Sequence, residues 1–138
     1  MTKRMSKKDM AFEIKFYEGI LARQPDFIEA LSALGDLYTY GGYFSEGLEI
    51  DLKLRRLKPD DPTVLYNLAC SYSLMGRIDY ALRTIKKAIN CGYADFQHLE
   101  ADEDLNNLRK DTRFKRYFQR VKNKKISRST KEKFYEKK

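Results

Sequence analysis

Residues 31–38 read LSALGDLY, and residues 65–72, which lie 34 positions further on, read LYNLACSY. The same offset joins Pro25 to Pro59 and Gly42 to Gly76. Self-similarity at a fixed spacing of this size is typical of chains built from stacked copies of one small unit. The sequence therefore predicts a repeat architecture, in contrast to a single fold around one catalytic cleft.

In each copy, two leucines and a tyrosine fall at positions i, i+3 and i+7, which lie on one side of an α-helix. A small residue follows the second leucine, and there a second helix can approach closely. Glycines near the end of each stripe, Gly42 and Gly76, are expected to stop the helix and permit a tight turn. Each copy thus predicts a helix, a turn and a second helix.

This pattern resembles the tetratricopeptide repeat, a helix–turn–helix unit, with leucine in place of its usual tryptophan. The resemblance implies an all-α solenoid of helical hairpins with about two full repeats, near 28–61 and 62–94, after a half repeat at 10–24. Where the family has an aromatic residue in the second helix, the first full copy has Asp51. The residues expected to pack the repeats together are Leu31, Leu34, Gly35, Tyr38, Leu65, Leu68, Ala69, Tyr72 and Ala81.

Residues 95–121 are expected to form a helical cap over the last repeat, because a solenoid needs its terminal apolar face covered. Asp111 is a predicted N-cap for a helix that carries Phe114 and Phe118. The stretch from Asp102 to Phe114 also resembles the acidic, leucine-containing tail that closes many bacterial tetratricopeptide proteins, which indicates a bacterial source. The predicted domain spans 10–121, between a basic segment at 1–9 and a Lys-rich segment at 122–138.

Charge is distributed unevenly along the chain. Residues 9–108 carry a net charge of −7, whereas residues 109–138 carry +11. The segment from Lys122 onward has few large apolar residues, so disorder or a frayed helix is expected there. Two alternatives remain open: the segment binds a polyanion such as nucleic acid or an anionic lipid surface, or it folds back on the acidic repeats.

Residues typical of catalysis or metal binding are sparse. His98 is the only histidine, and Cys70 and Cys91 are 21 residues apart without a CxxC motif. A zinc site needs about four ligands at close spacing. A nucleophilic pair of Cys70 and His98 is conceivable, but Cys70 falls within a helical pattern where a buried thiol is the ordinary explanation. We therefore expect no enzyme activity, no metal and no cofactor.

In the tetratricopeptide family, the first helix of each unit lines a concave groove that binds a partner. The resemblance implies that this groove is lined by Glu29, Ser32, Asp36, Thr39, Tyr40, Thr63, Tyr66, Asn67, Cys70, Ser73 and Leu74. The alternative is that these are only the hydrophilic faces of two helices. The carboxylates of Glu29 and Asp36 disfavour the anionic chaperone termini that some family members bind.

The sequence thus predicts a non-catalytic scaffold or adaptor that binds a peptide segment of an unidentified partner protein in this groove, as a monomer or weak homodimer. The alternative function is polyanion binding by the basic C-terminal segment. A secretory signal is not expected, since Asp9, Glu13 and Lys15 interrupt the N-terminal apolar residues. No run of 18 apolar residues occurs. We expect a cytoplasmic protein.

Overall fold

The computed structural model describes the backbone of residues 5–136 and the side chains of residues 5–128. This part of the chain forms eight α-helices and one short 3-10 helix, and it contains no β-strand. In chain order the elements are α1 (Lys7–Arg23), α2 (Ile28–Tyr40), α3 (Phe44–Leu57), α4 (Pro62–Leu74), α5 (Ile78–Asn90), α6 (Phe96–Ala101), the 3-10 helix (Glu103–Leu105), α7 (Asn106–Arg109) and α8 (Thr112–Glu136).

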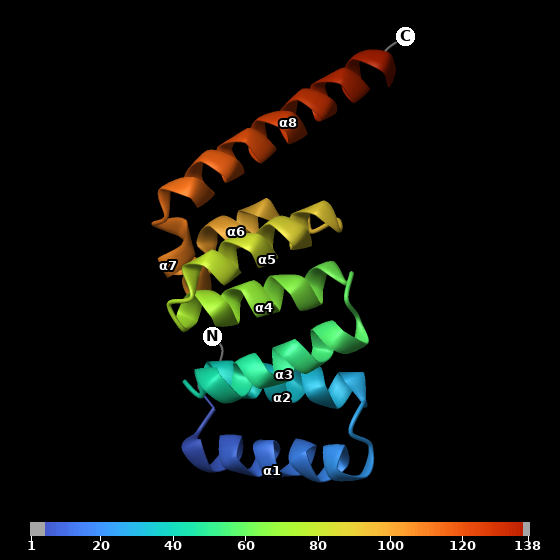
Figure 1. Cartoon of the computed structure of the whole chain (residues 1–138). Coiled ribbons are helices and arrows are strands. Elements are labelled where there is room, and N and C mark those ends of the chain that lie inside the picture. The colour runs from blue at the N-terminus through green and yellow to red at the C-terminus, as the bar shows by residue number, and fades with distance from the viewer. Residues whose placement is uncertain (1–4, 137–138) are drawn as a thin grey trace.

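The helices stack in the order of the chain. Helices α2 and α3 form one hairpin and α4 and α5 a second, while α1 packs on α2 and α3 packs on α4. Figure 1 shows these layers one above another, with α1 at one end and α8 leaving the opposite end at an angle. The prediction of an all-α helical repeat is confirmed. The boundaries proposed for the domain and its flanking segments stay a prediction.

Equivalent turns close the first helix of each hairpin. Gly42 and Gly76 have positive φ angles of 84° and 74°, a backbone conformation that glycine adopts without steric cost. In both turns the residue after the glycine donates a backbone hydrogen bond to the tyrosine carbonyl five positions earlier: Tyr43 to Tyr38 at 2.8 Å and Arg77 to Tyr72 at 2.9 Å. This bond is typical of a Schellman helix end. The two copies are therefore alike in the geometry of this turn as well as in sequence.

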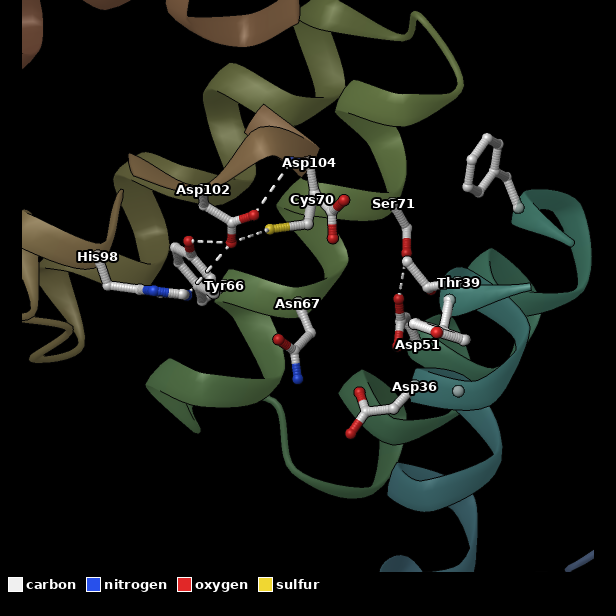
Figure 2. Close-up of a pocket in the computed structure, with 13 residues that line it drawn as sticks. Asp36, Thr39, Asp51, Tyr66, Asn67, Cys70, Ser71, His98, Asp102 and Asp104 are labelled. Carbon is white, nitrogen blue, oxygen red and sulfur yellow. Dashed lines mark hydrogen bonds and ion pairs between the residues drawn. The ribbon is translucent and has the colours of Figure 1, made fainter. Parts of the chain in front are cut away.

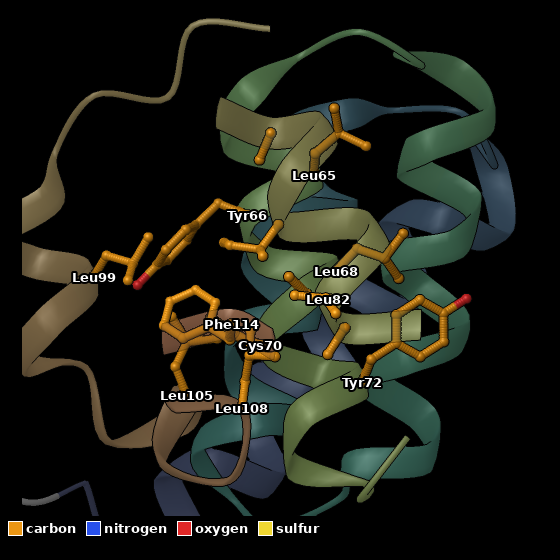
Figure 3. Packing of buried hydrophobic residues seen from close by; sticks show 14 of the residues in the cluster. Leu65, Tyr66, Leu68, Cys70, Tyr72, Leu82, Leu99, Leu105, Leu108 and Phe114 are labelled. Atoms are coloured by element: carbon orange, nitrogen blue, oxygen red, sulfur yellow. The ribbon is translucent and has the colours of Figure 1, made fainter. Parts of the chain in front are cut away.

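Most of the predicted packing residues lie in the interior. Eight of them, Leu31, Leu34, Gly35, Leu65, Leu68, Ala69, Tyr72 and Ala81, are buried, and Tyr38 is half-buried. A Cβ atom at Gly35 would lie 3.2 Å from Cγ2 of Ile50. Helix α4 supplies nine buried residues, and Figure 3 shows several of them among side chains from α5 and the cap. The leucine stripe is thus the face on which the hairpins stack.

The segment after α5 covers the open side of α4 and α5. Leu99, Leu105 and Leu108 are fully buried and join one apolar cluster with Phe114 and Phe118. Figure 3 places the cap leucines directly against this core. Burial of this kind contributes about 1.5–3 kcal/mol for each large apolar side chain. The cap therefore completes the hydrophobic core of the repeats.

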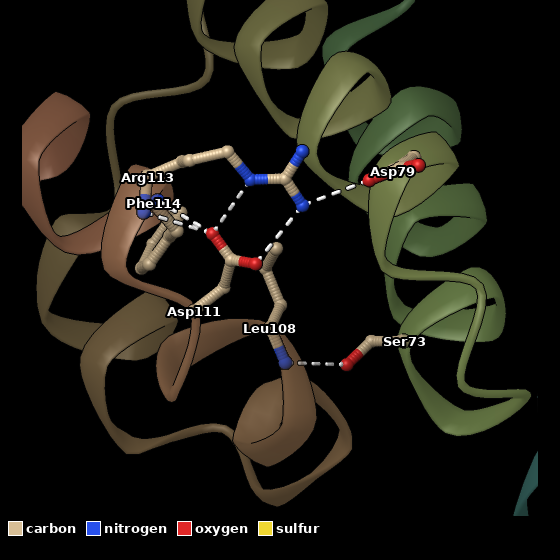
Figure 4. Close-up of polar contacts among 6 residues, drawn as sticks. All are labelled: Ser73, Asp79, Leu108, Asp111, Arg113 and Phe114. Carbon is tan, nitrogen blue, oxygen red and sulfur yellow. Dashed lines mark hydrogen bonds and ion pairs between the residues drawn. The ribbon is translucent and has the colours of Figure 1, made fainter.

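Polar contacts fix how the cap sits on the repeats (Figure 4). The backbone N–H of Leu108 donates to the buried hydroxyl of Ser73 at 3.1 Å. Asp111 caps α8 by accepting from the backbone of Arg113 and Phe114. The Arg113 guanidinium joins Asp111 to Asp79 of α5, at 3.0 Å and 2.8 Å. These contacts connect the start of α8 to the second hairpin.

Helix α8 continues through the described part of the Lys-rich segment to Glu136. Lys122 pairs with Glu100 of α6 at 2.7 Å. Lys125 donates to the carbonyl of Ala94 at 2.9 Å. The last two residues of that segment, and residues 1–4 of the basic N-terminal segment, lie outside the described residues. Two of the basic side chains of α8 are therefore held against α6 and the segment that precedes it.

We expect Ala69→Leu to lower the free energy of unfolding by about 1–3 kcal/mol, because the Ala69 side chain is fully buried and added methyl groups overpack the interface. Urea denaturation measures the change. Ala22→Leu, at an exposed position of α1, is the matched control and is expected to be near neutral. Equal effects of the two substitutions would contradict the assigned packing.

Phe114→Ala is expected to cost about 3–5 kcal/mol, since its ring is 2% exposed and its removal leaves a cavity beneath the cap. Phe12→Ala removes the same atoms from a side chain that is 72% exposed, and it is expected to change stability little. Thermal melting of both variants tests this difference. A neutral effect of Phe114→Ala would show that α8 does not stabilise the repeats.

Candidate binding pocket between the first helices

A pocket of about 380 Å³ lies where α2, α3 and α4 meet the cap. It is lined by side chains from both predicted repeats and from the segment 98–104, so the cap supplies part of its wall. Figure 2 shows these side chains converging from three directions. The lining residues are Gly35, Asp36, Thr39, Tyr40, Phe44, Asp51, Tyr66, Asn67, Cys70, Ser71, His98, Asp102 and Asp104.

Asp51 of α3 forms one wall of the pocket and is 6% exposed. Its carboxylate accepts a hydrogen bond from the Ser71 hydroxyl of α4. The pKa of Asp51 is raised to about 6, mainly by burial; the Ser71 hydrogen bond opposes the shift, and the nearby charge of Asp36 adds to it. Near neutral pH this site thus holds a carboxylate that has lost most of its water.

Asp102 organises the opposite wall. Its Oδ2 atom accepts from the Tyr66 hydroxyl at 2.6 Å and from the Cys70 thiol at 3.8 Å, and it lies 3.3 Å from Nε2 of His98. The Tyr66 ring stacks on Tyr93, with ring centroids 4.3 Å apart. One carboxylate of the cap therefore fixes three side chains on α4 and α6.

The pocket is strongly acidic. Asp36, Asp51, Asp102 and Asp104 line it, and no lysine or arginine of the described residues does. The pKa of Asp104 is raised mainly by burial and also by the neighbouring charge of Asp102. The pKa of Asp36 is also raised, because nearby protein displaces water from its carboxylate although the residue as a whole is exposed. An entering cation would relieve this crowding of negative charge.

Cys70 and His98 approach the same carboxylate oxygen of Asp102, and the thiol donates to that oxygen. Burial raises the pKa of the Cys70 thiol, and the charge of Asp102 adds to the effect. A protonated thiol is a weak nucleophile. Among the described residues, no group of three or more His, Cys, Asp and Glu side chains is arranged to hold a metal ion. The arrangement suits hydrogen bonding to a cationic group.

The structure brings together six of the eleven predicted groove residues. These six line the pocket: Asp36, Thr39, Tyr40, Tyr66, Asn67 and Cys70. The other five lie outside its lining: Glu29, Ser32, Thr63, Ser73 and Leu74. Ser73 departs most from the expectation, because it is fully buried and hydrogen-bonded to the cap. The candidate site is therefore narrower than the predicted groove.

The predicted groove leaves out seven lining residues: Gly35, Phe44, Asp51, Ser71, His98, Asp102 and Asp104. The sequence predicts Gly35 as a packing residue, suggests His98 only in a disfavoured catalytic pair with Cys70, and places Asp102 and Asp104 in the cap. One signal was available: Asp51 stands 34 residues before the apolar Ile85, and a carboxylate at a packing position needs a partner. No comparable sequence signal points His98 and Asp102 toward α4.

No family model matches the chain. Over 117 residues it is 28% identical to a chloroplastic protein of Arabidopsis thaliana, an alignment that covers 83% of this chain and 33% of that protein. Over 86 residues it is 33% identical to the TPR repeat-containing protein PA4667 of Pseudomonas aeruginosa, covering 60% of this chain and 14% of that protein. The chain thus spans a third or less of the curated relatives it matches.

The second similarity is to a protein named for tetratricopeptide repeats, and it agrees with the helical repeat described above. In the described residues, no helix combines the length and the apolar character needed to cross a bilayer.

The raised pKa of Asp51 makes stability depend on pH. Between its ordinary value of 3.8 and about 6, the folded state binds the proton more tightly than the unfolded state does. The free energy of unfolding is therefore expected to fall as pH rises through that window and to stay lower above it. Asp51→Asn should remove this loss and be more stable than the parent protein near neutral pH by on the order of 2–3 kcal/mol.

Urea unfolding of both proteins across this pH range measures the difference. Glu49→Gln, at an exposed carboxylate of the same helix, is the matched control and should not change the pH profile. A constant gap between the Asp51→Asn variant and the parent protein at all pH values would show that Asp51 does not titrate in this window.

Proposed function

We propose that the chain is a tetratricopeptide-type module that binds a short segment of a partner protein in the acidic pocket, without catalysing a reaction. Three findings support the proposal: the 34-residue repeat, the stacked helical hairpins, and the similarity to a TPR repeat-containing protein. Repeat folds of this kind present extended concave surfaces to their partners. Its expected cytoplasmic location, bacterial source and monomeric or weakly dimeric state stay predictions.

The observation that carries the proposal is a set of four carboxylates in a pocket that no described lysine or arginine lines. Carboxylates recognise the planar arginine guanidinium through paired hydrogen bonds, and lysine as a point charge. Tyr40, which is 58% exposed, adds an aromatic ring against which a cation can pack. The favoured ligand is therefore an arginine or lysine side chain of a partner segment.

The volume of the pocket fits this assignment. Its 380 Å³ lies at the small end of the range of about 300–1,000 Å³ typical of small-ligand sites. A side chain therefore suits the pocket better than a large cofactor does. The non-catalytic assignment is supported by the raised pKa of the Cys70 thiol and by the engagement of His98 with Asp102.

Helix α8 supports polyanion binding as a second candidate function. It extends away from the stacked hairpins in Figure 1 and presents the exposed cations Lys124 and Arg128. Lys122 and Lys125 are less available, since they contact Glu100 and Ala94. Electrostatic contacts to phosphates would make such binding fall steeply with salt.

We expect Asp36→Lys to weaken binding of a labelled arginine-rich peptide by about tenfold, because it places a cation at the mouth of the pocket. Fluorescence anisotropy measures the affinity. Glu29→Lys makes the same charge change on the same helix, at a residue outside the pocket lining, and should have a much smaller effect. A glutamine-substituted peptide reports binding that does not depend on the arginines.

Equal losses of affinity for Asp36→Lys and Glu29→Lys would mean that only net charge matters, which contradicts a specific pocket.

The second candidate function, polyanion binding, is tested with Lys124→Gln combined with Arg128→Gln. Loss of oligonucleotide binding in this variant, together with an arginine-peptide affinity that Asp36→Lys does not change, would favour polyanion binding over peptide binding in the acidic pocket.

A further inference from the structure

A second pocket, of about 500 Å³, lies between the C-terminal end of α3 and helix α5. Its charge is opposite to that of the acidic pocket. Arg55, Arg56, Arg83 and Lys87 line it, and within the described part of the chain no carboxylate does. We name it the cationic pocket.

Helix α4 separates the two pockets. Leu65 and Tyr72 of α4 line the cationic pocket, whereas Tyr66 and Cys70 line the acidic one. Residues 65 and 72 share one side of a helix, and residues 66 and 70 lie on another side, at least a quarter turn away. A ligand in the cationic pocket therefore approaches a face of the protein that the proposed peptide segment does not occupy.

The cations of this pocket are poorly compensated by nearby negative charge. Among the described residues, no carboxylate lies within ion-pair distance of Arg55, Arg56 or Arg83, although residues 9–108 carry a net charge of −7. Lys87 lies 3.8 Å from Asp60, and both side chains are largely exposed, so this contact is weak. Gathering cations without counter-charges is unfavourable by itself.

Stabilisation of the helix ends explains only part of this clustering of cations. Arg55 and Arg56 are in the last turn of α3, where cations interact favourably with the helix dipole. Arg83 lies in the interior of α5 and gains no such stabilisation. Its guanidinium carbon instead sits 4.8 Å from the centre of the Tyr80 ring, which orients the group at the pocket.

The cationic pocket also has an apolar floor. Leu65 is 1% exposed, and the Tyr72 ring stacks on Tyr80 with ring centroids 5.3 Å apart. Tyr80 itself is 51% exposed. A ligand that fits must therefore combine negative charge with an apolar or aromatic group.

We propose that the cationic pocket binds an acidic peptide segment, with carboxylates on Arg55, Arg56 and Arg83 and an apolar side chain against the exposed Tyr80 ring. This goes beyond the function proposed above, because it assigns a second partner of opposite charge to a different face. A chain that holds a basic segment on one side of α4 and an acidic segment on another side bridges two proteins.

A peptide fits this surface better than a nucleic acid strand does. A long polyanion carries charge at every nucleotide, and the acidic body of residues 9–108 repels it. Asp60, beside Lys87, adds a negative charge close to the cations. An acidic peptide places a few carboxylates at the arginines and leaves the rest of its length neutral.

The test measures binding of a short labelled peptide that carries a few glutamates and one phenylalanine among neutral residues, using the full chain. Arg56→Gln combined with Arg83→Gln should weaken binding by about tenfold or more, because two charge-assisted contacts are lost. Arg83→Lys keeps the charge and should still weaken binding, since lysine lacks the planar guanidinium fork. A matched peptide with glutamine in place of glutamate should not bind.

The control removes two cations elsewhere, with Lys15→Gln and Arg23→Gln at exposed positions of α1, and should change the affinity less than about twofold. A loss in this control equal to that in the double arginine variant would overturn the proposal, because binding would then follow net charge. Tighter binding of a single-stranded oligonucleotide, lost in the same arginine variant, would assign the pocket to nucleic acid instead.

Discussion

Burial of α4 on several sides is the constraint on which the rest of the structure depends. Nine of its 13 residues are buried, and it packs against α3, α5, the 3-10 helix and α7. A helix that is apolar around so much of its circumference is stable only inside a stack. The hairpin before α4 and the cap after it are therefore both needed, and the two pockets lie where those neighbours leave α4 partly uncovered.

The parts of the fold that follow local rules were predictable from the sequence. The stripe of Leu65, Leu68 and Tyr72 follows helical spacing and faces the interior, as such a stripe must when a second helix packs on it. Gly76 has the positive φ that a helix end of this type requires. Asp111 accepts the backbone hydrogen bonds expected of an N-cap. Each of these features depends on residues within about two turns of a helix.

The rest of the candidate site depends on positions that local rules do not determine. Asp102 meets Tyr66, 36 residues earlier, only because the chain turns back after Gly92, whose φ is 113°. At the equivalent position of the first full repeat stands Lys58, whose φ is −136°, so the 34-residue spacing carries no information about the direction of this turn. Ser71 and Asp51 meet across α3 and α4 for a similar reason. The helical period places both on their helices, but the packing angle between the helices brings the two side chains together.

Asp51 connects the stability of the repeat with the proposed binding. A buried carboxylate at a packing position destabilises the folded state above its raised pKa, whereas Ile85, at the equivalent position of the next repeat, adds apolar burial. A cation bound in the acidic pocket would lower the pKa of Asp51, because an opposite charge nearby favours the ionised form. By linkage, ionised Asp51 strengthens cation binding by the same factor. Asp51 therefore lowers the stability of the ligand-free protein and raises the affinity of the pocket for a cation. A residue that is unfavourable for packing but favourable for binding is typical of a functional site.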